Sequence, residues 1–507
     1  MRFGALILFV SFGLCAYSPS GLAQTSSRLD SFEVNLWSGD LDFLARQMPA
    51  KHANLFHAIR REQFDSAIAA IRNRLPSLRR SQVIVELMHL AALIGDGHTS
   101  LSPWRDSVVG FHTLPIALYR FSGGYYVRAA NREQASLLGA RVVRIGTVSV
   151  DSAEALVAPL ISKDNAMGVW AYAPVLFTMP ELLNALGVTR DTGSADFVFD
   201  VDGVPRTVTL HAAGPFPTVG GDADKSWNER TGWVDLRDRS PAPLWLSRTN
   251  ETYWFTYIPS AQILYCQLNE IQERGESLAR FIARAIAAAD SAGARRFVLD
   301  LRLNGGGNGY YNRVIVRAIV RSRFDEHGRL FVITSRRTFS AAQMLISDLE
   351  NWTNPIFVGE PSESRGNHYG DSRRLVLPNH GVTVRVSTLW WQYWDPRDTR
   401  PWIVPQIAAP LTVDAYEAGR DPALEAIARL EPRPSPSERL GPLLVASDSA
   451  TAWTMLDSLR HDPVNAWVDF GALLADMSAE LRAEDRAKAA DLAGRLGSRL
   501  PAWSLPR

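Results

Sequence analysis

The sequence predicts an α/β (α+β multidomain) protein, with helical segments at both ends of the chain and strands between them. A chain of 507 residues is too long for one hydrophobic core, so we expect several domains. Apolar residues recur at helical spacing over residues 28–95, whereas residues 107–212 alternate short β-type runs with turns. Two strand–loop–helix units then follow each other from residue 297 to about residue 349, and their loops carry the most distinctive chemistry of the chain.

Residues 1–23 have the features of a secretory signal peptide. Arg2 supplies a positive charge, residues 5–16 are apolar, and residues 21–23 (Gly-Leu-Ala) offer small side chains for cleavage. The apolar run is too short to span a membrane comfortably, which argues against a membrane anchor as the alternative. We therefore expect a mature chain that starts near Gln24, has no stable membrane insertion, and is periplasmic or secreted from a bacterium.

Charge and cysteine content exclude several other classes of function. The net charge of +1 gives no electrostatic basis for binding nucleic acid. Cleavage of the signal peptide would leave Cys266 as the only cysteine, so no intrachain disulfide is expected, and its strand-like context favours a core position over a nucleophile. We find no cluster with metal-ligand spacing, and the sequence implies neither a metal nor an organic cofactor.

The N-terminal half predicts two domains. Residues 28–105 predict a helical bundle of about three helices, whose last helix ends at Gly95 and leaves the next residues in a turn. Residues 107–212 predict a β domain that weakly resembles a PDZ-like module at residues 138–145, where a glycine turn precedes a strand. A clear carboxylate-binding loop is absent. Peptide capture by strand addition and a purely structural role both remain open.

The C-terminal half predicts a linker, a core and a helical appendage. Residues 213–250 are rich in Gly, Pro, Asp and Ser and are typical of a linker. Residues 251–429 form the predicted core. Residues 430–507 begin with a rigid Pro-rich segment and continue as Ala-, Leu- and Arg-rich helices without a recognisable motif.

Each loop of the core can be interpreted in two ways. The glycines of residues 304–309 allow backbone amides to approach a ligand, but such a loop is also typical of a tight turn. It matches neither a Rossmann fingerprint nor a P-loop. Ser340 lies at a predicted helix start, where it could act as a helix N-cap or as a nucleophile beside unpaired N–H groups. A nucleophile next to anion-stabilising amides is what acyl transfer requires.

These loops carry a resemblance to a known family. Residues 300–307 read Asp-Leu-Arg-Leu-Asn-Gly-Gly-Gly and resemble the Asp-x-Arg-x-Asn-x-Gly-Gly segment of the carboxyl-terminal processing (tail-specific) serine peptidases, which include a tricorn-core branch. Residues 338–343 read Thr-Phe-Ser-Ala-Ala-Gln and resemble the Thr-Ala-Ser-Ala-Ala-Glu nucleophile motif, from which Phe339 and Gln343 depart. The wider resemblance covers roughly residues 30–428.

The resemblance implies both a fold and a set of site residues. The fold would be a ClpP/crotonase-like core of repeated ββα units. Ser340 would be the nucleophile, and the backbone amides of Gly306 and Ala341 would form the oxyanion hole.

The distribution of lysine decides which general base to expect. Many members of the family use a Ser-Lys dyad, but the lysines of this chain stand only at positions 51, 163, 225 and 488. Arginine does not deprotonate at usable pH, so histidine is the natural alternative. His98 lies in an Asp-Gly-His-Thr segment that resembles a family motif, and in the tricorn-like branch the corresponding histidine is the base. His368 and His380, both in turn-like contexts, are the alternatives.

A third catalytic residue is the least defined part of the site. A carboxylate commonly fixes the tautomer of a histidine base. The tricorn-like branch places a glutamate shortly before its final Pro-x-Ile strand, and no glutamate aligns there in this sequence. Asp398 is the nearest carboxylate, with Glu360 or no third residue as alternatives.

The sequence as a whole therefore predicts a secreted serine-type endopeptidase that hydrolyses peptide or protein substrates through an acyl-enzyme. A homo-oligomer is compatible with it. One alternative is a catalytically silent crotonase-like protein that binds a ligand or a peptide, which the aromatic run at residues 390–394 would suit. Another is a scaffold that acts through the C-terminal helices.

Overall fold

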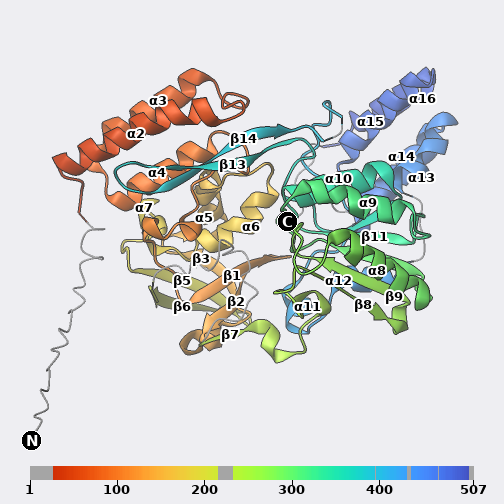
Figure 1. The fold of residues 1–507 in the computed structure, drawn as a ribbon, viewed down its shortest axis with the longest axis horizontal. Coiled ribbons are helices and arrows are strands. Elements are labelled where there is room, and N and C mark those ends of the chain that lie inside the picture. The colour runs from red at the N-terminus through yellow and green to blue at the C-terminus, as the bar shows by residue number, and fades with distance from the viewer. Residues whose placement is uncertain (1–26, 215–231, 394, 431–434, 466–467, 502–507) are drawn as a thin grey trace, which may run out of the picture.

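The computed structural model describes residues 27–214, 232–393, 395–430, 435–465 and 468–501. The predicted signal peptide, residues 215–231 of the predicted linker and residue 394 of the aromatic run lie outside these ranges. Figure 1 shows two lobes: the N-terminal helices and β domain form one, and the core and C-terminal helices form the other. Within the described ranges, no helix combines the length and the apolar character that a membrane span needs.

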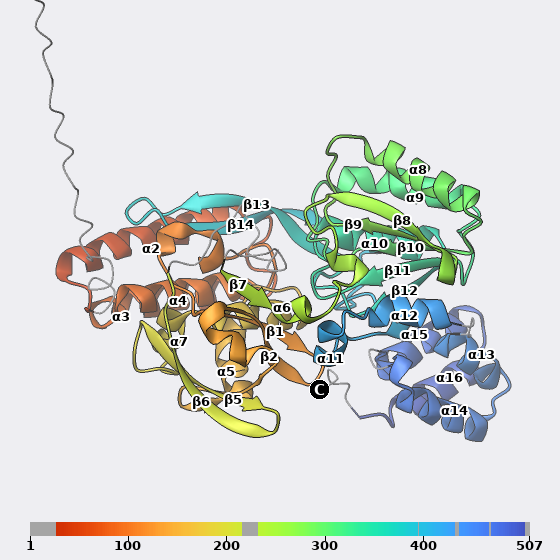
Figure 2. The same cartoon turned by 90° about the horizontal axis from the view of Figure 1, so that it is seen from below.

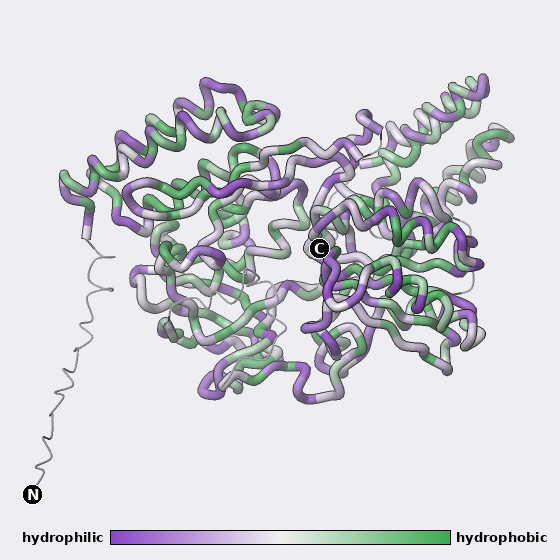
Figure 3. The backbone as a smooth tube through the Cα atoms, in the orientation of Figure 1, coloured by the Kyte–Doolittle hydropathy of each residue, from purple (hydrophilic) through white to green (hydrophobic). Residues whose placement is uncertain are grey.

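Three helices form the N-terminal region: α2 (Ser31–Lys51), α3 (Arg61–Arg74) and α4 (Arg80–Ala92). Asp30 starts α2 by accepting the Glu33 N–H at 2.9 Å, which satisfies one of the unpaired donors of the first turn. Buried apolar residues recur every three or four positions along α2, and the tube of Figure 3 alternates between hydrophilic and hydrophobic colours along α2 and α3. The periodicity that predicted helices here therefore marks the buried face.

The β domain is an antiparallel sheet in the order β1-β2-β3-β5-β6, with β4 pairing β3 and β7 pairing β2. One of its strands comes from the segment that the sequence predicted as a linker, since β7 pairs with the end of β2. The bounds are β1 (Ile116–Phe121), β2 (Gly124–Asn131), β3 (Arg141–Ile145), β4 (Val148–Ser149), β5 (Ser194–Val201), β6 (Val204–His211), β7 (Trp233–Asp235), α5 (Val150–Val157), α6 (Met167–Leu176) and α7 (Pro180–Ala185).

The core is a six-stranded sheet in the order β15-β12-β11-β10-β9-β8. All neighbours pair in parallel except the β8–β9 hairpin, so the loops after β10 and β11 leave the sheet at the same edge. The bounds are β8 (Tyr253–Ile258), β9 (Ile263–Leu268), β10 (Arg296–Asp300), β11 (Leu330–Thr334), β12 (Pro355–Gly359), β15 (Ile407–Ala408), α8 (Leu278–Ser291), α9 (Asn312–Val320), α10 (Ala341–Trp352), α11 (Val413–Glu417) and α12 (Pro422–Arg429).

Helices cover both faces of the core sheet. On β10, Phe297 and Leu299 pack with α8, α9 and α10, whereas Val298 between them packs with α11 and α12 on the other face. Figure 2 shows α8 and α9 on one side of the strands and α12 on the other. This covering explains why the core strands are apolar throughout, without the alternation of a half-exposed sheet.

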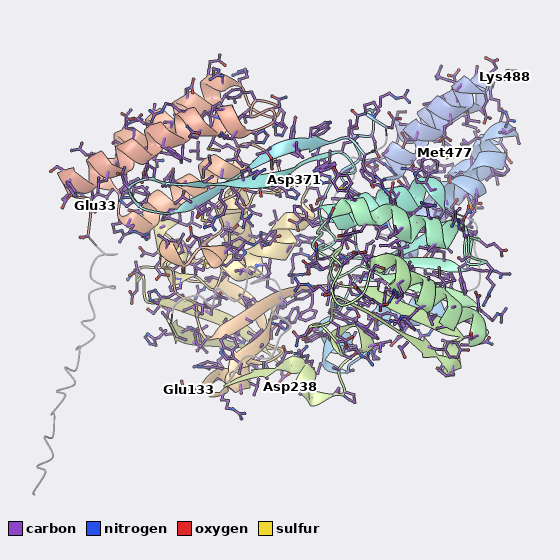
Figure 4. All side chains as sticks on the ribbon, in the orientation of Figure 1. Glu33, Glu133, Asp238, Asp371, Met477 and Lys488 are labelled. Carbon is purple, nitrogen blue, oxygen red and sulfur yellow. The ribbon has the colours of Figure 1, made fainter. Side chains whose placement is uncertain are left out.

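A long hairpin connects the two lobes. Its strands β13 (His368–Val376) and β14 (Thr383–Trp391) leave the core and lie against the N-terminal helices (Figure 1). Figure 4 places Asp371 of this hairpin between Glu33 of α2 and Met477 of the C-terminal helices. Ser100 pairs with Arg385 of β14, and the Ala53 N–H donates to the Ser387 carbonyl at 3.1 Å. The hairpin therefore ties the segment that follows α4 to the core.

One local expectation was wrong. His368 was expected in a turn, whereas it is the first residue of β13. The C-terminal region has four helices around a separate hydrophobic cluster: α13 (Pro436–Val445), α14 (Ser449–His461), α15 (Phe470–Ala483) and α16 (Ala487–Gly497).

Candidate active site

Ser340 and His98 meet where the two lobes join. His98 follows α4, Ser340 immediately precedes α10, and the His98 Nε2 lies 3.0 Å from the Ser340 Oγ. The two residues are 242 positions apart in the chain. Because the two residues are so far apart in sequence, the hydroxyl and the imidazole come within hydrogen-bonding distance only when the chain folds.

The loop that carries Ser340 is held against the glycine loop. The Phe339 N–H donates to the Asn304 carbonyl at 3.1 Å, and the Thr338 hydroxyl donates to the Leu301 carbonyl at 3.0 Å. Both contacts are consequences of β10 and β11 being adjacent parallel strands. The two motifs of the sequence therefore form one structural unit.

Ser340 has an unusual backbone conformation. Its φ of 56° and ψ of −123° lie outside the regions that a residue with a Cβ normally adopts. Such a conformation costs on the order of 1–3 kcal/mol and persists only where surrounding contacts impose it. Although Ser340 occupies the N-cap position of α10, its side chain makes no capping hydrogen bond. Its hydroxyl contacts His98 instead, so helix capping does not account for this serine.

His98 is enclosed by aromatic rings. Phe339 stacks on it with a centroid separation of 4.4 Å, and His368 stacks nearly parallel at 5.7 Å. Burial lowers the pKa of His98, the neighbouring His368 lowers it further, and Asp96 opposes them, so that the pKa falls to about 3. At neutral pH the imidazole is therefore uncharged, and its Nε2 can accept the Ser340 proton.

The other ring nitrogen of His98 makes no well-formed hydrogen bond within the described residues. Its Nδ1 is buried, and no acceptor in the described part of the chain meets hydrogen-bonding geometry. The Tyr369 backbone lies near enough to raise the pKa of His98, although it does so less than the other contacts. A carboxylate on Nδ1, as in a Ser-His-Asp triad, is thus not part of this arrangement.

The glycine loop packs directly against the nucleophile. Gly306 has a φ of +113°, and a Cβ there would lie 2.8 Å from the Cβ of Ser340, so no larger residue fits without displacement. The Gly306 N–H donates to the Asn304 Oδ1 at 2.9 Å. A substrate oxygen could use this N–H only by replacing Asn304. The Ala341 N–H, at the first turn of α10, has no acceptor among the described residues.

A cavity of about 190 Å³ adjoins the site. It is lined by the glycines at 305–307 and by Phe339 on the core side, and by Arg105 and Tyr172 on the side of the N-terminal lobe. A larger cavity of about 420 Å³ lies between the core and the C-terminal helices, and none of its lining residues belongs to the Ser340 site. The smaller cavity is the one that a substrate at Ser340 would enter.

The structure does not bring Asp398 to His98. The Asp398 carboxylate accepts the Arg400 side chain at 2.8 and 3.0 Å, and Arg400 also binds Glu350 at 2.7 Å. Burial raises the pKa of Asp398, but the hydrogen bonds and charge of Arg400 outweigh this and lower it. Neither Asp398 nor any other carboxylate of the described residues accepts a hydrogen bond from the His98 ring.

The remaining candidates also have other partners. Glu360 binds Arg336 in a buried ion pair, with an Nε–Oε2 distance of 2.9 Å. His380 binds Asp40 through Nδ1 at 2.7 Å and stacks on Trp37 of α2. His368 donates from Nδ1 to a backbone carbonyl at 3.0 Å and reaches the site only as a ring stacked on His98.

Three residues around His98 had no assigned role in the sequence. Asp96 accepts the His98 N–H at 2.9 Å, and it also binds His52 at 2.9 Å and Ser387 at 2.7 Å. Asp96 was visible as part of the Asp-Gly-His-Thr segment. His52 and Ser387 had no signal in the sequence, because they lie 44 and 291 positions from Asp96 along the chain.

Neither a family model nor a curated protein matches the chain. Mature CPAF aligns over 79% of this chain and 97% of its own, with 14% identity and a TM-score of 0.55.

A mutant of CPAF aligns over 80% of this chain and 100% of its own, with 12% identity and a TM-score of 0.57. The photosystem II D1 C-terminal processing protease aligns over 77% and 97%, with 14% identity and a TM-score of 0.37, which is too low to support an argument. The chain therefore shares the α/β multidomain fold of CPAF.

Proposed function

We propose that this chain is a serine peptidase in which Ser340 is the nucleophile and His98 is the general base. The observation that carries the proposal is the 3.0 Å contact between the His98 Nε2 and the Ser340 Oγ. It is supported by the strained backbone of Ser340, because strain of this kind gathers at functional sites. The motif resemblance at residues 300–307 and 338–343 points to peptide bonds rather than to other acyl compounds.

The proposed reaction follows from these positions. The Ser340 Oγ attacks the carbonyl carbon of the scissile bond while its proton passes to the His98 Nε2. The resulting oxyanion meets the Ala341 N–H at the start of α10, where the helix dipole also favours negative charge. The Gly306 N–H joins it once the substrate oxygen replaces Asn304.

The second half of the reaction reverses the proton transfer. The tetrahedral intermediate collapses, and His98 gives its proton to the departing amine. A water molecule then loses a proton to His98 as it attacks the acyl-Ser340 ester. Peptide or protein substrates would approach through the cavity of about 190 Å³ beside the glycine loop.

A fluorophosphonate probe tests the nucleophile, because it labels only an activated serine. We expect the probe to modify Ser340, as read by mass spectrometry of the labelled peptide, and Ser340→Ala to abolish labelling. Ser347→Ala is the matched control, because Ser347 lies on the same helix and its Oγ accepts a hydrogen bond from the Gln343 Nε2 at 3.2 Å. Undiminished labelling of Ser340→Ala would remove the assignment of the nucleophile to Ser340, whereas no labelling of the wild-type protein would favour a silent binding protein.

Export is proposed on the sequence of residues 1–23 alone. Expression of the full chain in a bacterium should give a processed protein outside the cytoplasm that begins near Gln24. N-terminal sequencing of the purified protein checks this, and an intact Met1 in a cytoplasmic product would contradict it.

A further inference from the structure

Asp96 is a fully buried carboxylate with four hydrogen-bond donors. It is 2% exposed. Its Oδ1 accepts the N–H groups of His98 and Thr99 at 2.9 and 2.6 Å and the Ser387 hydroxyl at 2.7 Å. Its Oδ2 accepts from the His52 Nε2 at 2.9 Å. This set of donors satisfies the carboxylate and fixes the backbone of the base at the same time.

The four donors carry no positive charge. Two are backbone amides and one is a hydroxyl. The fourth, His52, accepts the Asn54 N–H on its Nδ1 at 2.9 Å, so that nitrogen holds no proton. His52 is therefore a neutral imidazole that donates from Nε2, a tautomer assigned from its hydrogen bonds.

The carboxylate is ionised despite its burial. Burial by itself raises the pKa of Asp96, but the hydrogen bonds from His52 and Ser387 and the electrostatic effect of His52 outweigh it and lower the pKa to about 2. With the His52 tautomer assigned from its hydrogen bonds, Asp96 is a buried carboxylate held by neutral donors. The titratable ring nearest to it along the chain is the imidazole of His98, two residues away.

His98 needs a negative charge when it becomes an imidazolium. His368 on β13 and Arg105 of the 3₁₀ turn at Pro103–Arg105 both oppose a positive charge on it, whereas Asp96 favours one. The other carboxylate at this loop is Asp164, which accepts the Gly97 N–H at 2.7 Å and whose pKa is raised by burial. Asp398, the carboxylate expected from the sequence, pairs with Arg400 instead.

We propose that Asp96 is the positioning residue of the His98 base: it holds the His98 backbone and supplies the negative charge that stabilises the imidazolium. This inference rests on the proposed function. In the step concerned, the proton moves from the Ser340 Oγ to the His98 Nε2, and Asp96 stays ionised throughout. The negative charge of Asp96 acts on His98 through space, while its hydrogen bond holds the His98 backbone. In a Ser-His-Asp triad, by contrast, the carboxylate accepts a hydrogen bond from the histidine Nδ1.

The test must separate the effect of the negative charge of Asp96 from the effect of its hydrogen bonds to the loop of His98. Asp96→Asn alone would turn an amide donor toward the His52 Nε2–H, which is a poor contact. In the double variant His52→Gln/Asp96→Asn, the Gln carbonyl can accept from the new Asn, so neutral hydrogen bonding is restored without the charge. His52→Gln alone keeps a neutral donor to a charged Asp96 and is the reference.

The measurements are the melting temperature and the rate of fluorophosphonate labelling of Ser340 from about pH 2 to pH 8, a range that includes the lowered pKa of His98. We expect the double variant to melt near the His52→Gln reference but to be labelled at least about tenfold more slowly, the equivalent of one pKa unit. Loss of the charge should also move the acidic limb of its labelling profile to lower pH, because His98 becomes harder to protonate.

Two results would overturn the inference. One is a double variant that is labelled as fast as the His52→Gln reference and with the same pH profile. The hydrogen bonds of residue 96 to the loop would then be enough for the reaction without the negative charge. The other comes from Ser387→Ala, which removes a bracing bond but leaves the charge. If Ser387→Ala folds and is labelled at least about tenfold more slowly than the wild-type protein, loss of one hydrogen bond to the loop is sufficient and the charge does not explain the effect. This comparison does not need a folded double variant.

The failure of this inference differs from a failure of the proposed function. Absence of labelling on Ser340 in the wild-type protein would remove the peptidase proposal itself. A labelled wild-type protein with an unaffected double variant would remove only the role of Asp96.

Discussion

His98 combines partial burial, aromatic stacking and a direct contact with Ser340. His98→Ala should lower the rate of Ser340 labelling by about 10²–10⁴, the range attributed to general base catalysis. His380→Gln is the control, because His380 binds Asp40 on α2 and makes no contact with Ser340. If His98→Ala keeps the wild-type rate while His368→Ala loses it, the base is His368.

The pH dependence of that labelling follows from the same environment. A base must be unprotonated to act, so activity falls as the pH drops through the pKa of His98. Since that pKa is lowered to about 3, the acidic limb should lie well below the value of about 6.5 for a free imidazole. Burial is the largest cause of this lowered pKa, and the neighbouring His368 adds to it.

Gly306 and Gly305 provide a matched pair in the glycine loop. A Cβ on Gly306 would lie 2.8 Å from the Ser340 Cβ and 3.1 Å from the Ala341 N, whereas a Cβ on Gly305 would meet nothing within 4 Å. Gly306→Ala should therefore cost about 10²–10³ in labelling rate, as the loss of one oxyanion donor does. Gly305→Ala should be close to wild type. Equal rates for the two variants would show that the loop serves only as a turn.

At the scale of elements, a buried ion network joins β10 to α12. Arg302 donates to Asp421 at 2.8 and 3.0 Å and to Asp300 at 3.1 Å, and Asp421 also caps α12 by accepting the Leu424 N–H at 3.2 Å. Because Arg302 lies just before the glycine loop, this network holds the strand end from which the loop starts.

Asp421→Ala should destabilise the protein by roughly 3–5 kcal/mol, because it leaves the buried Arg302 without one partner and removes a helix cap. Urea unfolding followed by circular dichroism measures the change. Asp414→Asn, at an exposed position in the first turn of α11, should change stability by less than about 0.5 kcal/mol. Similar midpoints for both variants would refute the structural role of the network.

At the scale of the whole molecule, Ser340 and His98 come from two lobes, and the C-terminal helices form a hydrophobic cluster separate from theirs. The hairpin β13–β14 contributes Leu377, Val384 and Val386 to the same hydrophobic cluster as α2 and α4. Helices α13–α16 have a cluster of their own. Ser340 and His98 are thus held together by contacts in which these helices take no part.

A chain that ends at residue 434 should therefore keep the wild-type rate of Ser340 labelling. It retains the Leu430 carbonyl, which accepts the Arg296 side chain at 2.9 Å, so the end of α12 stays attached. Labelling of the truncated and full chains, compared at equal concentration, checks this. A truncated protein that is folded but not labelled would show that the C-terminal helices support the site and would revive the scaffold interpretation.

The sequence by itself determined the local parts of this protein. Helical spacing of apolar residues predicted α2, α3 and α4, because each of these helices buries one face. Continuous apolar runs predicted β9, β10 and β11, because these strands are buried on both faces. The motifs around Gly306 and Ser340 could be recognised for the same reason: each lies within a few consecutive residues. The absence of a nearby lysine also directed attention to His98.

Only the tertiary structure decided which distant residues meet. Asp398 was the expected carboxylate, but it pairs with Arg400, two residues away, and accepts no hydrogen bond from the His98 ring. Asp96, by contrast, lies in the same turn as His98 and is kept ionised by two hydrogen-bond donors. His52 comes from the end of α2, and Ser387 comes from the β13–β14 hairpin. Such contacts span 44 and 291 residues and leave no periodic pattern, because they depend on how α2, α4 and β14 pack against one another.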